Sequence, residues 1–279
     1  RQRQMCIRDR HKSAYLNLPF FTIRFVVYGL LWIGIARILR KYSLMEDKLG
    51  GIKPHKRSKK WSSIFLVVFG VTSSTFAWDF LMSIDFHWYS TLFGWYATVS
   101  LWLCCLATVI LIIIYLKNTG HLPQVNENHI HDLGKYLFGF SVFWTYLWFS
   151  QYMLIWYGNI PEETTYFLYR HEHYHFIWIL NLCINFFVPF LVLMMRNAKR
   201  NYNVLAVICV VVLMGHWLDL FVMIMPGTVK EGWGIGLHEI LMPIGYAGLF
   251  LYIVFNALSK APLIPLKHPY YKESIQHHT

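Results

Sequence analysis

The feature that most constrains this chain is a series of apolar runs, each long enough to cross a lipid bilayer, which takes about 20 residues of helix. Seven runs are expected to form transmembrane helices, at residues 20–39, 62–84, 91–116, 134–157, 174–195, 204–225 and 238–258. Charged residues make up only 14% of the chain, whereas soluble domains carry about 25%. The sequence therefore predicts an all-α polytopic membrane protein, embedded in the lipid bilayer through residues 13–258.

Basic residues predict the orientation of these helices. Segment 40–61 holds eight Lys and Arg residues, and segments 196–202 and 259–279 hold three each, whereas 85–90 holds none. The positive-inside rule places the basic segments in the cytoplasm, so residues 259–279 are expected to form a cytoplasmic tail. The net charge of +11 is therefore interpreted as a topology signal, and no nucleic-acid partner is expected.

The first residues, RQRQMCIRDR, do not match the rest of the chain. They are not a signal peptide, because no short apolar core with a small-residue cleavage site follows them. We interpret residues 1–12 as a non-native or disordered leader outside the fold. The natural N-terminal part of the protein is then expected to lie upstream of this sequence.

Two ionisable residues lie inside the apolar run 204–225. His216 and Asp219 are three residues apart, so both project from the same face of a helix. A charged side chain near the bilayer centre costs about 2.5–3.5 kcal/mol on insertion scales, so such residues usually mark functional sites. The pair predicts a site that handles protons or binds a polar ligand. The alternative is a structural polar contact between helices.

Asp79 gives a second signal of this kind, inside the run 62–84. It is a candidate proton acceptor, and hydroxyl residues at 72–75 precede it. The alternative is a structural hydrogen bond or a salt bridge to Arg24 or Arg37.

Further polar and aromatic residues fall in the outer half of the membrane in the predicted topology. The candidates for a ligand-binding role are Trp78, Asp85, His87, Trp88, Trp217, His238 and Glu239. Tryptophan is also typical of interfacial belts, which is the alternative for the indole side chains.

The sequence argues against a metal or haem centre of its own. Four of the five cysteines lie in apolar runs and none forms a CxxC motif. Only His216 lies deep in a predicted span, whereas a bis-histidine haem needs two facing histidines. The alternating histidines in segment 170–175 suit a strand better than a helix face, so a partner contact or a solvated loop is the favoured interpretation. No metal ligand is predicted.

Three motifs resemble one family of membrane proteins. They are FAWDFLMSIDFHWYSTLFGWY at 76–96, GHWLD at 215–219 and IMPG at 224–227. Together they resemble the membrane subunits of bacterial alternative complex III, a quinol:cytochrome c oxidoreductase. The similarity is greatest to the quinone-binding ActF-type subunit and next to its paralogue ActC. Both are similar to the NrfD/polysulfide-reductase membrane anchors.

This resemblance implies about ten transmembrane helices, most of them in two four-helix bundles, of which the present chain holds the last seven. It implies a location in the bacterial inner membrane and a role in the respiratory chain. The implied partners are a paralogous quinone-binding membrane subunit, an iron–sulfur subunit and a multihaem cytochrome c subunit. The substrate would be a quinol such as menaquinol, bound in the outer half of a bundle.

The leading hypothesis is a subunit that oxidises quinol. Asp79 or Asp219 accepts a hydroxyl proton, and His216 hydrogen-bonds the ring oxygen or relays the proton outward. Trp78 and Trp217 line the ring pocket, and electrons leave to partner subunits. Two alternatives remain open, namely a proton-translocating half-channel without quinone turnover and a purely structural anchor.

Overall fold

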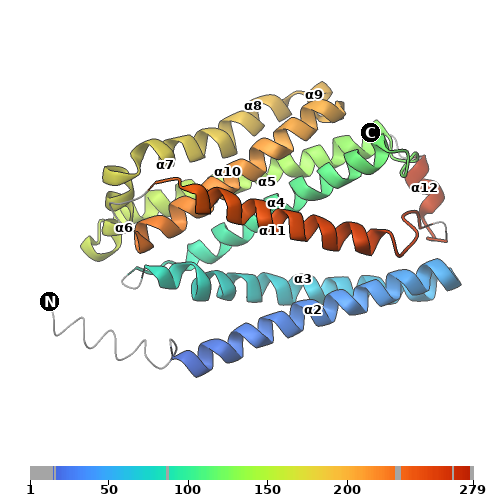
Figure 1. Cartoon of the computed structure of the whole chain (residues 1–279), viewed down its shortest axis with the longest axis horizontal. Coiled ribbons are helices and arrows are strands. Elements are labelled where there is room, and N and C mark those ends of the chain that lie inside the picture. The colour runs from blue at the N-terminus through green and yellow to red at the C-terminus, as the bar shows by residue number, and fades with distance from the viewer. Residues whose placement is uncertain (1–14, 16, 86–87, 230–233, 266, 277–279) are drawn as a thin grey trace.

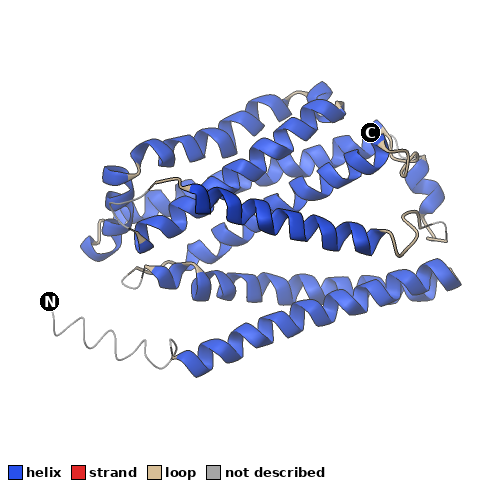
Figure 2. Ribbon diagram, in the orientation of Figure 1, coloured by secondary structure: helices blue, strands red, loops and turns tan. Residues whose placement is uncertain are grey.

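The computed structural model describes residues 15, 17–85, 88–229, 234–265 and 267–276, and all regular structure in these residues is helical (Figure 2). The longer helices are α2 (Leu18–Leu49), α3 (Ile52–Phe80), α4 (Thr91–Asn118), α5 (Glu127–Gly158), α6 (Pro161–His173), α10 (Tyr202–Thr228) and α11 (Leu237–Leu258). The shorter ones are η1 (Met82–Ile84), α7 (His175–Leu182), η2 (Cys183–Phe187), α8 (Val188–Met194), α9 (Arg196–Arg200) and α12 (Tyr271–Ile275). The predicted all-α polytopic membrane fold is confirmed.

Six segments in the described residues are long and apolar enough to cross a membrane. They correspond to six of the seven predicted spans. The remaining one, predicted at 134–157, lies in α5, which has 32 residues but falls short of the apolar character of the others. The reason is its composition, since Trp, Tyr, Ser and Gln side chains carry polar groups. The count of seven spans stays a prediction.

The basic segment 40–61, which separates the first two predicted spans, is helical except at its turn. Helix α2 continues to Leu49 and α3 begins at Ile52, so only Gly50 and Gly51 separate them. Both glycines have positive φ values, 66° and 85°, which side chains rarely adopt. Lys, Arg and Glu are good helix formers, so the helices run on past the apolar stretch and reverse within two residues.

Helices α4, α5, α7–α8 and α10 form a four-helix bundle (Figure 1). The α2–α3 hairpin joins this bundle through α3, which packs on α4. Helix α11 crosses the molecule in Figure 1 and has no buried residue among those described. Figure 1 places α6 at one end of the bundle and α9 at the other, and these are called the α6 end and the α9 end below.

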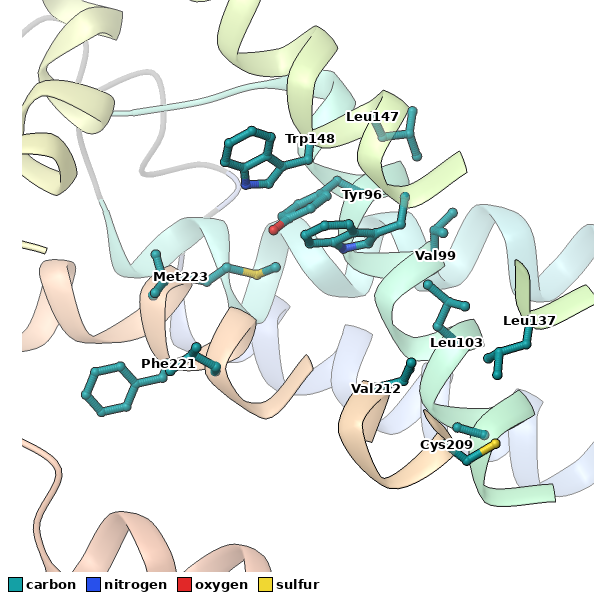
Figure 3. Close-up of a cluster of buried hydrophobic side chains, with 14 of the residues drawn as sticks. Tyr96, Val99, Leu103, Leu137, Leu147, Trp148, Cys209, Val212, Phe221 and Met223 are labelled. Atoms are coloured by element: carbon teal, nitrogen blue, oxygen red, sulfur yellow. The ribbon is translucent and has the colours of Figure 1, made fainter. Parts of the chain in front are cut away.

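The bundle core is aromatic toward the α6 end and aliphatic toward the α9 end. Figure 3 shows Tyr96, Trp148 and Met223 together in one part of the core and Leu103 and Val212 in another. Burying apolar side chains among neighbours at close range provides the packing that holds membrane helices together.

The helix predicted at 174–195 is irregular near Pro189. The chain forms a π-helical turn, η2, in which the N–H of Val188 donates to the carbonyl of Cys183. Pro189 follows as the second residue of α8 and has no N–H to donate. The wider turn accommodates the proline. It also places Asn185 in the bundle interior, where this residue is 1% exposed.

Candidate functional site

Asp219 is the centre of a buried polar network in the four-helix bundle. It is 1% exposed and accepts three hydrogen bonds from side chains of two other helices. Ser100 Oγ donates at 3.0 Å and Asn181 Nδ2 at 2.9 Å, and the Tyr96 hydroxyl is the third donor. Three donors compensate much of the cost of removing a carboxylate from water.

The network extends to two further helical elements. Trp144 Nε1 on α5 donates to Ser100 Oγ at 2.8 Å, and Asn185 Nδ2 in η2 donates to Asn181 Oδ1 at 2.6 Å. Gly215 on α10 makes room for Asn185, since a Cβ there would lie 2.3 Å from its Oδ1. The polar atoms of all four bundle helices therefore converge on one carboxylate.

His216 lies on the same face of α10 as Asp219, as the spacing predicted. Its Nδ1 is 3.9 Å from Asp219 Oδ2, which is too far for a hydrogen bond. Both ring nitrogens are buried and have no hydrogen-bond partner among the residues that the structure describes, and the ring packs edge-to-face with Trp144 at 5.6 Å between ring centres. A buried polar group left unpaired costs about 1–3 kcal/mol. His216 therefore has unused donor and acceptor capacity beside a carboxylate.

A small cavity adjoins this network. Asn181 and Asp219 form part of its polar wall, and its aromatic wall includes Trp148 and Phe167. The cavity has a volume of about 20 Å³, and one water molecule needs about 10–15 Å³. The cavity has room for about one water and not for a quinone ring.

Arg170 borders the cavity from α6 and is 2% exposed. Its Nε donates to the carbonyl of Val222 at 3.1 Å and its Nη2 to that of Met223 at 3.1 Å. The Val222 carbonyl has no α-helical donor because residue 226, four positions on, is a proline. Burial lowers the pKa of the guanidinium, and the nearby Tyr166 opposes this shift.

Segment 170–175 was expected to be a partner contact or a solvated loop, and the solvated loop is wrong, since α6 extends to His173 and Arg170 is buried. The segment also does not have the alternation of a strand. The rings of His171 and His175 are 4.6 Å apart, whereas His173 packs on Tyr169.

Asp79 lies in a different environment from Asp219. It is 2% exposed and accepts two bonds from Arg24, at 2.8 Å from Nε and 3.0 Å from Nη2. The Tyr28 hydroxyl donates a third at 3.0 Å. The salt bridge to Arg24 that the sequence left open is present, and it links α2 to α3. The three predicted catalytic residues therefore fall into two clusters, Asp79 in the hairpin and His216 with Asp219 in the bundle.

The predicted ligand-binding residues are also spread over several places. Trp88 is 3% exposed and stacks on Tyr166 with ring centres 3.8 Å apart, near the cavity. Asp85 follows η1 and is half-buried. His87 lies outside the described residues. Trp217 is half-buried and packs beside Phe221, on α10.

Trp78 contacts the start of α4 and not the network. Its Nε1 would lie 2.8 Å from a Cβ at Gly94. This nitrogen is buried and has no hydrogen-bond partner in the described part of the chain. His238 is exposed, and Glu239 Oε2 accepts the backbone N–H of Gly236 at 2.9 Å. Glu239 thus caps the first turn of α11.

Several members of the network were absent from the sequence-based candidates. They are Tyr96, Ser100, Trp144, Asn181 and Asn185. Arg170, at the border of the cavity, was absent as well. The four-residue spacing of Asn181 and Asn185 in an apolar run was a usable signal, because polar pairs on one face of a membrane helix usually point inward. Tyr96 and Ser100 have the same spacing.

A comparison with family models and with characterised proteins finds no match to this chain.

Proposed function

We propose that this chain is an integral membrane subunit of a quinol:cytochrome c oxidoreductase of the bacterial inner membrane, similar to those of alternative complex III. It binds quinol near the α6 end of the bundle and takes up the quinol protons. Its tail, 259–279, lies in the cytoplasm. One observation carries the proposal: a carboxylate with three donors, Asp219, lies beside an imidazole with two unpaired nitrogens, His216, at a cavity.

In the proposed quinol oxidation this chain takes up protons and transfers no electrons. Oxidation of one quinol to quinone releases two protons and two electrons. Asp219 and His216 are proton acceptors of suitable type, and Tyr96 can pass a proton to Asp219 through its hydroxyl hydrogen bond. The electrons go to iron–sulfur and multihaem cytochrome c subunits outside this chain, beside a paralogous membrane subunit.

Ring binding requires the cavity to widen, because the space beside Asp219 fits about one water. Helix α6 contributes Tyr166, Phe167 and Arg170 to the wall. It begins after Asn159, whose φ is 43°, and ends at the irregular residue Tyr174. A displacement of α6 would break the Arg170 hydrogen bonds to α10 and open the cavity, while the contacts among the four bundle helices remain, so we propose quinol entry there.

The size of the cavity also favours a second candidate, a proton half-channel without quinone turnover. A single water beside Asp219 is enough to relay a proton but not to hold a ring. Photo-affinity labelling with a quinone analogue separates the two candidates. Labelling of Trp148 or Phe167 favours quinol binding, and labelling confined to the paralogous subunit favours the half-channel.

The deciding test is quinol:cytochrome c turnover in membranes that carry Asp219→Asn in the full-length protein, with assembly checked on a native gel. Asn keeps the shape but cannot accept the proton, so turnover is expected to fall about 10²-fold or more. The matched control is Glu172→Gln, an exposed carboxylate on α6, which should leave turnover unchanged. Full turnover in an assembled Asp219→Asn complex would contradict both the quinol and the half-channel proposals.

A further inference from the structure

A cluster of metal-ligating side chains lies far from Asp219, where the α2–α3 hairpin meets the C-terminal tail. Glu46 is near the end of α2, His55 is in the first turn of α3, and His268 is in the tail. Each offers one ligand atom, and the three atoms lie within 4.8 Å of one another. Three separate segments of the chain thus converge on one point.

We propose that Glu46, His55 and His268 bind a divalent transition-metal ion of the Zn²⁺ class, with water as the fourth ligand. Imidazole favours zinc and its neighbours over magnesium and calcium. Two histidines and one glutamate with an open fourth position form a recurring zinc ligand set. This site goes beyond the proposed function, which concerns quinol and protons in the bundle.

The distances suit a tetrahedral ion. Glu46 Oε1 is 3.3 Å from His55 Nδ1 and 3.7 Å from His268 Nε2. Ligand atoms about 2.0–2.2 Å from a tetrahedral zinc ion lie about 3.4 Å from one another. Small rotations of the side chains are therefore enough to coordinate an ion.

The surroundings favour a bound cation. Glu46 is 7% exposed, and a buried carboxylate is costly unless it is paired. His55 and His268 are half-buried, which leaves an opening for the ion and its water. The Tyr270 ring packs on both imidazoles, at 5.5 Å and 6.0 Å between ring centres, and limits their orientations.

Two hydrogen bonds must open when the metal binds. His55 Nδ1 and Glu46 Oε1 form the first at 3.3 Å, and the ion takes the place of the proton between them. The second lies in the tail. The N–H of Tyr270 donates to His268 Nδ1 at 3.2 Å. An imidazole that binds metal through Nε2 keeps its proton on Nδ1, so Nδ1 can no longer accept this bond. The residues involved lie in an irregular turn before α12, so the change is local.

A metal ion here would fasten the tail to the hairpin. The tail already contacts the hairpin through Lys267 Nζ, which donates to the carbonyl of Lys48 at 2.7 Å. Coordination adds bonds from both hairpin helices to His268. The expected effect is a tail that resists proteolysis only when the metal is bound.

The test uses the full chain purified in detergent, with His277 and His278 replaced by Ala in every sample so that this pair binds no metal. About one Zn²⁺ per chain is expected, and Co²⁺ should give the visible absorption of a tetrahedral site. Glu46→Gln and His55→Ala should each weaken binding about 10-fold or more. His121→Gln is the control, because His121 lies at the same end and its Nδ1 pairs with Thr119.

A second measurement needs only the parent protein of this series. Zn²⁺ should slow tryptic cleavage after Lys267 and Lys272, and EDTA should reverse this protection. The proposal is overturned if the parent protein binds no Zn²⁺, or if folded Glu46→Gln and His55→Ala proteins bind it as tightly as the parent. Protection that is the same with Zn²⁺ and with EDTA would likewise assign the cluster to hydrogen bonding alone.

Discussion

Two buried carboxylates in this chain have similar exposure but different partners. Asp79 is paired with the guanidinium of Arg24, whereas Asp219 is held by uncharged donors and the nearest nitrogen of His216 lies 3.9 Å away. A paired carboxylate is already neutralised and fastens two helices. The proposed chemistry is assigned to Asp219 because its hydrogen-bond donors are uncharged and because it borders the cavity beside His216.

Removing Arg24 is expected to damage folding more than chemistry. Arg24→Met leaves Asp79 buried without its charge partner, which costs about 3–5 kcal/mol. The double variant Arg24→Met, Asp79→Leu should recover much of this stability. Thermal unfolding in detergent measures both. Equal stability of the parent and Arg24→Met would contradict a structural role for the pair.

Replacing His216 is expected to lower turnover without lowering the stability of the protein. His216→Leu removes two unpaired buried nitrogens, so the free energy of unfolding should stay the same or rise by about 1–3 kcal/mol. Turnover should fall about 10²-fold if the imidazole handles protons. Unfolding and turnover assays on the same preparation give the answer. A variant that loses stability and keeps its turnover would identify His216 as a packing residue.

At the scale of elements, α6 is held to α10 by a side chain that replaces a backbone donor. Pro226 leaves the Val222 carbonyl without an α-helical N–H, and Arg170 supplies the missing hydrogen bond. The same guanidinium lies 3.3 Å from the ring centre of Tyr166. Helix α6 is thus attached at the point where α10 would otherwise expose a polar group.

A double-mutant cycle tests this attachment. Arg170→Met should destabilise the protein by about 1.5–3 kcal/mol, since it removes charge-assisted hydrogen bonds to buried carbonyls. Pro226→Ala restores an N–H that can bond to Val222, so Arg170→Met should cost less in that background, with a coupling of about 0.5–3 kcal/mol. Additive effects in unfolding experiments would rule out the replacement.

The sequence predicted the elements better than their contacts. Runs of apolar residues reveal membrane helices, and the three-residue spacing of His216 and Asp219 correctly predicted a shared face. The spacing within one helix cannot reveal which side chains of other helices meet that face. Asn181 and Ser100 were therefore missed, and Asp79 was grouped with Asp219 although each lies in its own cluster.

At the scale of the whole molecule, the two ends of the helices differ in the segments and the charges that they carry. The α9 end, the turn at Gly50–Gly51 and the C-terminal tail lie at one end of the molecule, and α6 lies at the other (Figure 1). The basic segments 40–61 and 196–202 belong to the first end. The positive-inside rule therefore predicts a single orientation in the membrane.

Cysteine accessibility in right-side-out membrane vesicles tests this orientation. With Cys6 replaced by Ser, Thr165→Cys on α6 should react with a membrane-impermeant maleimide in intact vesicles. Ser259→Cys, just after α11, should react only after permeabilisation. The reverse pattern would invert the topology and would place Asp219 in the cytoplasmic half of the membrane.

The π-helical turn at Cys183–Phe187 also sets the angular phase between two halves of one membrane helix. A π turn contains one residue more than the α turn it replaces, and each residue of an α-helix advances by about 100°. The wider turn takes up this extra residue, so α7 and α8 keep nearly the phase of an uninterrupted α-helix. Asn181 and Leu193 therefore both face the core, although their spacing of 12 residues would place them about 120° apart on a regular α-helix. Deleting one residue at the π turn is expected to leave both side chains in the core, whereas the same deletion within α7 would rotate the preceding residues by about 100°.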